Sequence, residues 1–108
     1  MSRFARRQDA NHNELIEAYE RMGVAVIDLS KAAEVVRPGL PDLLCGLHGH
    51  TWLTEVKTDI GDLSPMQLHF MEFWKGHVTV ARSVDDVILI VKEIKALGDI
   101  GRFVKRKA

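Results

Sequence analysis

The chain has 108 residues, of which 46% are apolar and 28% are charged, and it contains a single cysteine. These proportions are typical of one globular domain, and they exclude a disordered, collagen-like or disulfide-rich protein. The longest apolar run, residues 87–91, is far too short to cross a bilayer, and the Arg-rich start lacks the apolar segment of a signal peptide. We therefore expect one domain over residues 1–108 that stays inside the cell, in the cytoplasm, without a membrane partner.

The zero net charge hides an uneven distribution of basic residues along the chain. Both ends are basic and contain no acids: Arg3, Arg6, Arg7, then Arg102, Lys105, Arg106 and Lys107. Subtracting these 7 from the 15 basic residues leaves 8 against 15 acidic residues, a net charge of −7 for residues 8–101. An acidic body suits a cation site. The basic ends, 1–8 and 102–108, either contact a phosphate backbone or remain flexible, solvated tails.

Apolar periodicity and the placement of Gly, Pro and Ser divide the chain into helices and strands. Gly23 ends the first helix, whereas Ser64-Pro65 and Ser83 begin later ones. We predict helices at 9–22, 64–75 and 83–97, a helical turn at 31–36, and strands at 24–29, 42–47, 51–57 and 77–81, with a hairpin turn at 48–50. The order α-β-β-β-α-β-α predicts an α/β fold with a mixed central sheet flanked by helices. The last two strands are expected to be parallel, joined by a right-handed crossover.

Two acidic residues and a lysine are expected to meet on the hairpin around Gly49. Side chains alternate along a strand, so Glu55 and Lys57 share one face. Counting outward from Gly49 places Asp42 level with Val56, beside Glu55. Two carboxylates with carbonyl and water oxygens form the ligand set of Mg²⁺ or Mn²⁺, and Lys57 is placed to activate a water molecule. The alternative is an edge strand with a solvent-facing charge pair.

These residues carry a resemblance to a known superfamily. Pro41-Asp42, followed after twelve residues by Glu55-Val56-Lys57, resembles the signature of the PD-(D/E)XK nucleases. The predicted order of elements is similar to their restriction-endonuclease-like core, so the resemblance covers most of the chain. A narrower similarity, to the virus-type replication-repair nuclease branch with its compact stand-alone phage proteins, lies in Arg37-x-Gly39-x-Pro41-Asp42-Leu43 and Ser64-x-x-Gln67. This form is typical of a bacterial or phage-infected host cell.

The resemblance implies a Mg²⁺- or Mn²⁺-dependent endonuclease that hydrolyses DNA, with a role in DNA repair. The implied metal ligands are Asp42, Glu55, Glu14 on the first helix, and a carbonyl oxygen at Val56. Lys57 activates the water, and Gln67 lies on a helix stripe that faces the sheet and orients the site. Stand-alone members suggest branched substrates such as four-way (Holliday) junctions, cut by a homodimer with two sites. Candidate nucleic-acid contacts are Arg7, Arg37, Lys105 and Arg106.

Two other functions remain open at this point. One is a DNA-junction-binding module of a repair or packaging complex that keeps the fold without cleaving. The other is a structural or interaction protein with these charges at its surface. Glu14 is either a ligand or a solvent-facing carboxylate, and Arg37 either holds a phosphate or lies at the surface before a turn.

The remaining conspicuous residues have ordinary structural interpretations. Cys45 is expected to be a small core residue. The pair His48 and His50 is not expected to bind a metal, because no further Cys or His lies at zinc-site spacing. Three neighbouring aromatic residues are expected in the core rather than on a base-stacking platform: Phe70, Phe73 and Trp74.

Overall fold

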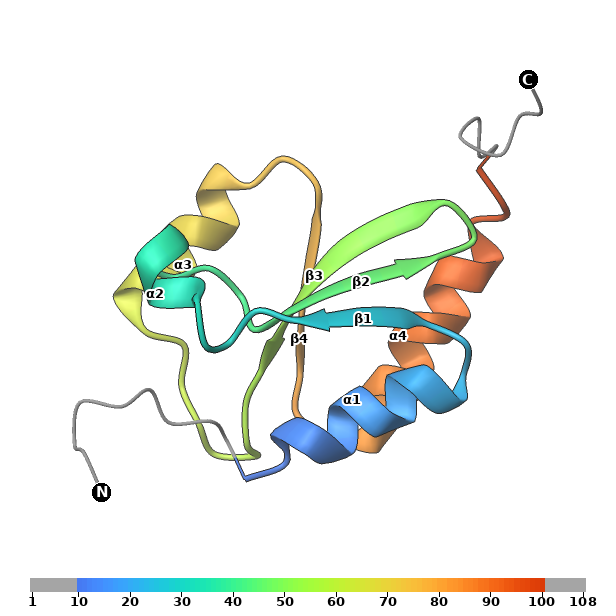
Figure 1. Ribbon diagram of the computed structural model, residues 1–108, viewed down its shortest axis with the longest axis horizontal. Helices are drawn as coiled ribbons and strands as arrows, with labels where there is room; N and C mark the ends of the chain where they lie inside the picture. Colours follow the sequence, from blue (N-terminus) through green and yellow to red (C-terminus); the bar gives the residue numbers. More distant parts are fainter. Residues whose placement is uncertain (1–9, 101–108) are drawn as a thin grey trace.

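A computed structural model describes residues 10–100, in which helices surround a four-stranded sheet (Figure 1). The strands, in their order across the sheet, are β1 (Ala25–Asp28), β2 (Leu43–Leu47), β3 (His50–Val56) and β4 (His77–Ala81). The helices are α1 (His12–Arg21), α3 (Pro65–Phe73) and α4 (Val84–Ala96), with one further turn of helix, α2 (Ala33–Val36), after β1. The predicted α/β fold and its order of elements are confirmed.

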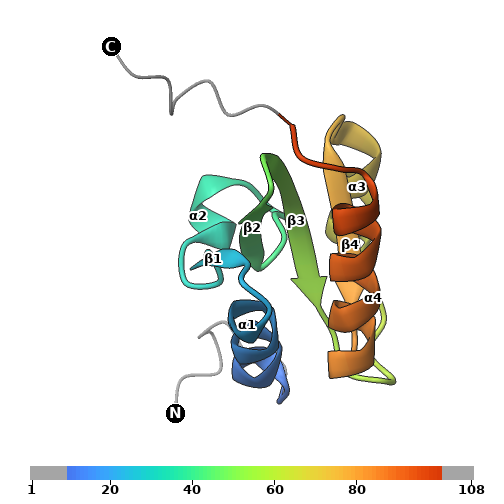
Figure 2. The same ribbon diagram turned by 90° about the vertical axis from the view of Figure 1, so that its right-hand side faces the viewer.

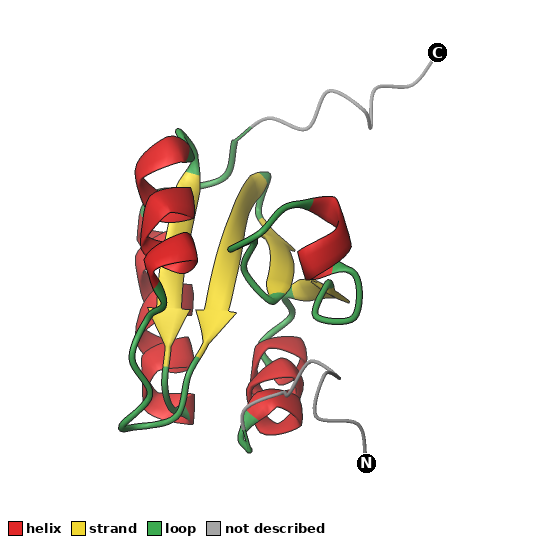
Figure 3. Cartoon of the chain, turned by 90° about the vertical axis from the view of Figure 1, so that its left-hand side faces the viewer, coloured by secondary structure: helices red, strands yellow, loops and turns green. Residues whose placement is uncertain are grey.

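The sheet is mixed, and β3 lies inside it. β2 pairs antiparallel with β1 and with β3, whereas β3 and β4 run parallel and are connected through α3. In Figure 3, β3 and β4 lie side by side with their arrows pointing the same way. Because β3 has a hydrogen-bonded neighbour on both sides, the alternative of an edge strand is wrong. No helix within residues 10–100 has the length and apolar character needed to cross a bilayer.

The turn between β2 and β3 consists of two residues, His48 and Gly49. Both have positive φ, 55° and 84°, as do the tight turns that match the twist of a hairpin. The sequence placed His50 in the turn as well, but His50 begins β3 opposite Leu47. Its buried ring has Nε2 2.6 Å from the carbonyl oxygen of Gly98, which ties the start of β3 to the end of α4.

The shorter turn moves the pairing of the two strands by one residue from the predicted register. Leu43 lies opposite Thr54. One residue further from the turn, Asp42 is therefore level with Glu55, whereas the sequence count had placed it level with Val56. The correction brings the two carboxylates directly across from each other.

One face of the sheet carries the main apolar core, covered by α1 and α4. In Figure 2, α4 lies in front of the sheet and the fainter α3 lies behind it. Cys45 is buried in this core, as predicted. The buried members of the core are Leu15, Ala18, Tyr19, Val24, Leu43, Cys45, Trp52, Val56, Ala81, Val87, Val91 and Ile94.

The opposite face of β3 carries Leu53 and Glu55, both buried, and it faces α3 instead of α1 and α4. Phe70 of α3 is buried, as predicted. The prediction is wrong for Phe73 and Trp74, which are 51% and 40% exposed. α3 is covered on one side only, so the end of the helix turns aromatic rings towards solvent.

A cluster of polar groups sits inside the main core. The Tyr19 hydroxyl lies 2.8 Å from Oγ1 of Thr54 and accepts a hydrogen bond from Nε1 of Trp52 at 3.3 Å. The Cys45 sulfur lies 3.6 Å from the same Thr54 oxygen. Burial raises the pKa of Tyr19 from 10.0 to about 12 and that of Cys45 from 9.0 to about 11. Both groups are therefore held in their neutral forms.

We expect this cluster to make the fold sensitive to alkali. A raised pKa contributes stability below the unfolded-state value, and that stability is lost as the pH rises through the folded-state value. With shifts of about two units each, the free energy of unfolding should fall by roughly 3 kcal/mol between pH 8 and pH 11. Urea unfolding at both values measures the fall. Cys45→Ala lacks the thiol, so its free energy of unfolding should decrease by only roughly 1 kcal/mol between the same pH values. An unchanged decrease in this variant would show that other groups cause it.

Candidate active site

Glu55 is buried on β3, an interior strand of the sheet. It lies near the C-terminal end of β3, is 2% exposed, and pairs across the parallel ladder with Val80 of β4. A carboxylate at such a place is costly unless hydrogen bonds or opposite charge compensate. One compensating contact comes from Gln67 of α3, whose Nε2 donates to Oε2 of Glu55 at 2.9 Å. The predicted direction of Gln67, towards the sheet, is confirmed.

Asp42 is held beside Glu55 by both neighbouring strands. It is 6% exposed, and its Oδ2 accepts a hydrogen bond from the backbone N–H of Val56 at 2.9 Å. On the other side, its carbonyl oxygen accepts from the N–H of Leu29 at 2.7 Å. Just before β2 begins, the Asp42 carbonyl thus still pairs with the segment after β1. On the β3 side, its carboxylate accepts the N–H of Val56 in place of a main-chain carbonyl. This fixes both the position and the orientation of the carboxylate.

The first turn of α3 fixes the amide of Gln67 at both of its ends. Ser64 is the N-cap, and its Oγ accepts from the backbone N–H of Gln67 at 3.2 Å. In return, Oε1 of Gln67 accepts from the backbone N–H of Ser64 at 2.8 Å, which completes a capping box. Since Oε1 is engaged by a donor, the other end of the amide is the donor that meets Glu55. The Ser64-x-x-Gln67 pattern therefore combines helix capping with orientation of the buried carboxylate.

The loop before Asp42 passes directly against the same turn of α3. Gly39 has φ of 84°, and a Cβ at this position would lie 2.2 Å from the carbonyl oxygen of Met66. That distance is far below any allowed contact, and the obstructing atom is backbone. Glycine is therefore required here because the two segments approach so closely. The contact holds the Asp42 loop and the start of α3 in one arrangement.

Gly39→Ala should cost much more stability than Gly23→Ala, which is its matched control. Gly23 has nearly the same φ, 88°, but an added Cβ would meet nothing within 4 Å. Backbone strain alone costs about 1 kcal/mol, whereas the clash with α3 should raise the cost at Gly39 to roughly 3 kcal/mol. Urea unfolding of both variants gives the difference. Equal losses in the free energy of unfolding of the two variants would show that the close approach to α3 adds nothing to the cost at Gly39.

Lys57 follows β3 directly and is half-buried. Its backbone N–H donates to the carbonyl oxygen of Ala81 at 3.1 Å, and its carbonyl oxygen accepts from Nδ2 of Asn11 at 3.2 Å. The same amide donates to the carbonyl oxygen of Arg82 at 2.9 Å. Asn11 therefore joins the start of α1 to the ends of β3 and β4. This role of Asn11 was not predicted, since no local pattern marks an amide that bridges three distant segments.

The loop after Lys57 lies close to its aliphatic stem. A Cβ at Gly61 would be 3.4 Å from Cδ of Lys57. Arg82 holds this loop by donating from one guanidinium nitrogen to the carbonyl oxygens of Thr58 and Gly61, at 2.8 Å and 2.6 Å. Lys57 is thus confined both by the sheet and by the loop, which limits the directions its ammonium can take.

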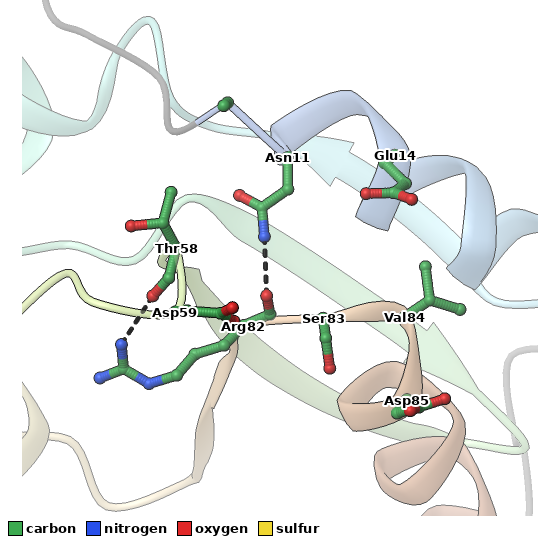
Figure 4. Close-up of a pocket in the computed structure, with 9 residues that line it drawn as sticks. Asn11, Glu14, Thr58, Asp59, Arg82, Ser83, Val84 and Asp85 are labelled. Carbon is green, nitrogen blue, oxygen red and sulfur yellow. Dashed lines mark hydrogen bonds between the residues drawn. The ribbon is translucent and has the colours of Figure 1, made fainter.

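Glu14 lies apart from the carboxylate pair. It is exposed on α1 and lines a hollow of about 380 Å³ at the ends of β3 and β4, near Asn11, Asp59 and Asp85 (Figure 4). Neither Asp42 nor Glu55 lines this hollow. Within residues 10–100, no three side chains of His, Cys, Asp or Glu are grouped closely enough to hold a metal together. The structure therefore does not bring Glu14 to the other two predicted carboxylate ligands, Asp42 and Glu55.

Asp42, Glu55 and the Val56 carbonyl nevertheless offer an oxygen set that suits a hard cation. In an extended strand, the N–H and C=O of one residue point to the same side. The Val56 carbonyl therefore points to the side of β3 on which its N–H meets Asp42. An ionised carboxylate has about four acceptor positions, so it can accept hydrogen bonds and ligate a cation at the same time. Mg²⁺ usually retains several waters and needs only one or two carboxylates, so this set fits it.

The predicted nucleic-acid contacts are only partly within the described residues. Arg37 is exposed, and its guanidinium carbon lies 3.9 Å from the centre of the Phe73 ring. Arg7, Lys105 and Arg106 lie outside residues 10–100. Both possibilities proposed for Arg37 include an exposed side chain, and its stacking on an aromatic ring was not anticipated.

The histidines of the described residues lie in several different environments. His69 and His77 are exposed, and Nε2 of His50 lies within hydrogen-bonding distance of the carbonyl oxygen of Gly98. His12 of α1 is buried with Nε2 3.1 Å from Oδ2 of Asp28 on β1. Burial tends to raise the pKa of Asp28, but hydrogen bonds from Ser30 and His12 outweigh it, so that the pKa is lowered. This pair joins α1 to the edge of the sheet.

No protein-family model, no curated protein and no solved structure matches the chain. The functional assignment therefore depends on the geometry of the residues themselves.

Proposed function

We propose that this protein is a metal-dependent nuclease of the PD-(D/E)XK superfamily, in its virus-type replication-repair branch, that hydrolyses DNA phosphodiester bonds. The observation that carries the proposal is the buried pair Asp42 and Glu55, level with each other on neighbouring strands and oriented by Val56 N–H and Gln67. Two acids buried side by side place like charges close together where water is excluded, so the pair favours a bound cation. A divalent cation would offset both charges.

Each residue has a distinct part in the proposed reaction. Mg²⁺ or Mn²⁺ bound at this site would polarise the phosphate and lower the pKa of an attacking water. Asp42 and Glu55 would supply the negative oxygens that hold the cation, and the Val56 carbonyl would add a neutral one. Lys57, at the end of the same strand, places a positive charge beside the attacked phosphorus and positions the water. Gln67 keeps the Glu55 carboxylate in one orientation.

The proposed substrate is branched DNA such as a four-way junction. The described body is small, and symmetric cutting of a junction needs two sites, which a homodimer with a twofold axis would supply. The proposed place of action is the cytoplasm of a bacterium or an infected host. Light scattering of the purified protein at micromolar concentration measures the oligomeric state, and a monomer would remove the paired-site part of the proposal.

The decisive experiment is cleavage of end-labelled DNA by the purified full chain. Four-way junction, duplex and single-stranded substrates are incubated with Mg²⁺, with Mn²⁺ or with EDTA, and products are separated on a denaturing gel. We expect cutting with either metal and none with EDTA, with the junction cut fastest. Equal cutting of all substrates would support the nuclease and remove its structural specificity.

The same experiment separates the proposal from its two alternatives. Gel-shift binding of the junction without cutting under any metal condition would indicate a non-cleaving junction-binding module. Neither binding nor cutting, together with a melting temperature insensitive to divalent cations, would indicate a structural protein. A metal-dependent melting temperature is expected for the nuclease, because a ligand that binds only the native state stabilises it.

A further inference from the structure

We propose that the C-terminal end of α3, with Arg37, is a stacking site for an unpaired nucleobase of the DNA strand that enters the active site. The proposal rests on the proposed function, since it names which part of a nucleic acid this surface takes. The stacking site is defined by Phe73, Trp74 and the guanidinium of Arg37. Its rings are 51% and 40% exposed, although the sequence predicted them to be buried.

The rings are held rigidly from below. Phe70 is buried beneath them, and its centre lies 5.7 Å from Trp74 in a stacked arrangement with 18° between the ring planes. Phe73 lies 6.0 Å from Phe70 at a tilt of 60°. Gly76 allows the indole to lie over the following backbone, because a Cβ there would be 2.8 Å from Nε1 of Trp74. Rings that are already ordered lose little conformational entropy when a base stacks on them.

Arg37 gives the stacking site its charge and its third flat surface. Its guanidinium carbon lies 3.9 Å from the centre of Phe73, in a cation–π contact. The guanidinium is planar, so a base can stack on it while its N–H groups remain available to a phosphate. Exposed aromatic rings beside a fixed positive charge match a nucleotide, which has a flat apolar base and an anionic backbone. The Arg37 cation favours an anionic ligand over an apolar one at this place.

The stacking site lies within a short reach of the proposed chemistry. Gln67, which contacts Glu55, is on the same helix as Phe73 and six residues before it. At a rise of 1.5 Å per residue, this separation is about 9 Å along the helix axis. Stacked nucleotides are about 3.4 Å apart on one strand, so the site would hold a base roughly two or three nucleotides from the scissile bond.

An unpaired base is the part of DNA that such a surface recognises. Bases within a duplex are already stacked on both faces, whereas unpaired bases in single strands or at branch points can stack on protein rings. Stacking on an aromatic side chain does not depend on base identity. The stacking site therefore favours DNA with unpaired nucleotides next to the cut and shows little sequence preference.

The test is DNA binding in EDTA, where cleavage does not interfere. The probes are a fluorescein-labelled single-stranded oligonucleotide and a blunt duplex of the same sequence, measured by anisotropy. Phe73→Ala and Trp74→Ala should each weaken single-strand binding about 10-fold, and leave duplex binding within about twofold. Leu89→Ala, which removes an equally exposed apolar side chain from α4, is the matched control and should change neither. Arg37→Lys keeps the charge but not the plane, so it should weaken single-strand binding as Arg37→Ala does.

Tryptophan fluorescence provides a second readout. The chain has two tryptophans, of which Trp52 is buried and Trp74 is exposed, so quenching by the oligonucleotide reports on Trp74. We expect quenching by the single strand and its loss in Trp74→Phe, whose circular dichroism should match the wild type. Single-strand affinities unchanged in both ring variants, or reduced equally for duplex and single strand, would overturn the stacking site.

Two further outcomes distinguish the stacking site from a dimer contact and from the nuclease itself. If Phe73→Ala and Trp74→Ala shift a wild-type dimer to monomer in light scattering and leave DNA affinity unchanged, the rings contact a second copy and the inference fails. If the wild type shows ring-dependent single-strand binding yet cuts no DNA with Mg²⁺ or Mn²⁺, the nuclease fails and the stacking site stands. Cutting without any ring dependence of single-strand binding would overturn the stacking site and leave the nuclease in place.

Discussion

Asp42→Asn is expected to abolish metal-dependent cleavage, with a rate loss of about 10³-fold or more, while the fold is retained. The amide oxygen of asparagine can still accept the hydrogen bond that Val56 N–H donates at 2.9 Å. What disappears is the negative charge on which the proposed cation binding depends. The variant therefore separates the structural role of this side chain from its proposed chemical one.

The thermal readout for this variant does not require any substrate. At a metal concentration ten times Kd, a native-state ligand adds about 1.4 kcal/mol, which corresponds to roughly 5–10 °C in Tm for a domain of this size. The wild type should show this increase with Mg²⁺ or Mn²⁺, and Asp42→Asn should not. Asp62→Asn, in the exposed loop before α3, is the control and should keep the full increase. A persistent increase in Asp42→Asn would place the metal elsewhere.

Lys57→Ala should lower the cleavage rate by about 10²- to 10³-fold and leave metal binding intact. The lysine follows β3 in sequence, and its backbone contacts to Ala81 and Asn11 do not involve the side chain. Removing the ammonium should therefore leave the strand in place. What is lost is the positive charge that we propose lies beside the attacking water and the phosphate in the transition state.

Single-turnover cleavage at saturating metal measures this loss, and the metal-dependent increase in Tm serves as the control for an intact site. Lys57→Arg keeps the charge but changes its shape and cannot reproduce a compact ammonium, so it should recover only part of the rate. Lys75→Ala, on the exposed segment between α3 and β4, should cleave like the wild type. An unchanged rate in Lys57→Ala would end the proposed role of this residue.

Local signals in the sequence predicted most of the fold. Ser64-Pro65 marks the start of α3, Ser83 marks the start of α4, and the alternation in β3 puts Glu55 and Trp52 on opposite faces. These signals act between residues close in the chain, through caps, turns and side-chain periodicity, so they can be seen without a tertiary structure. The mixed sheet followed from the lengths of the connections, since a hairpin turn forces antiparallel strands and a helical crossover permits parallel ones.

The residues of the candidate site could be predicted from the sequence, but the pairing of β2 with β3 that aligns them was predicted one residue out of register. The residue types at Asp42, Glu55 and Gln67 were evident, and the structure places them together. The pairing was misjudged by one residue because a positive φ at His48, a non-glycine residue, has no clear sequence signal. A shift of one residue decides which side chains face each other across a hairpin.

Contacts between distant segments, and the apolar residues left uncovered, became known from the three-dimensional packing alone. Asn11 joins the ends of β3 and β4 across 46 and 71 residues of sequence, and no local pattern encodes such a contact. Phe73 and Trp74 have the same apolar character as buried Phe70, but α3 is covered on one side only. Helices, strands, their order and the side chains available on each face could be predicted from the order of amino acids. Packing determined the partners, because burial depends on every element that covers a residue and not on the residue alone.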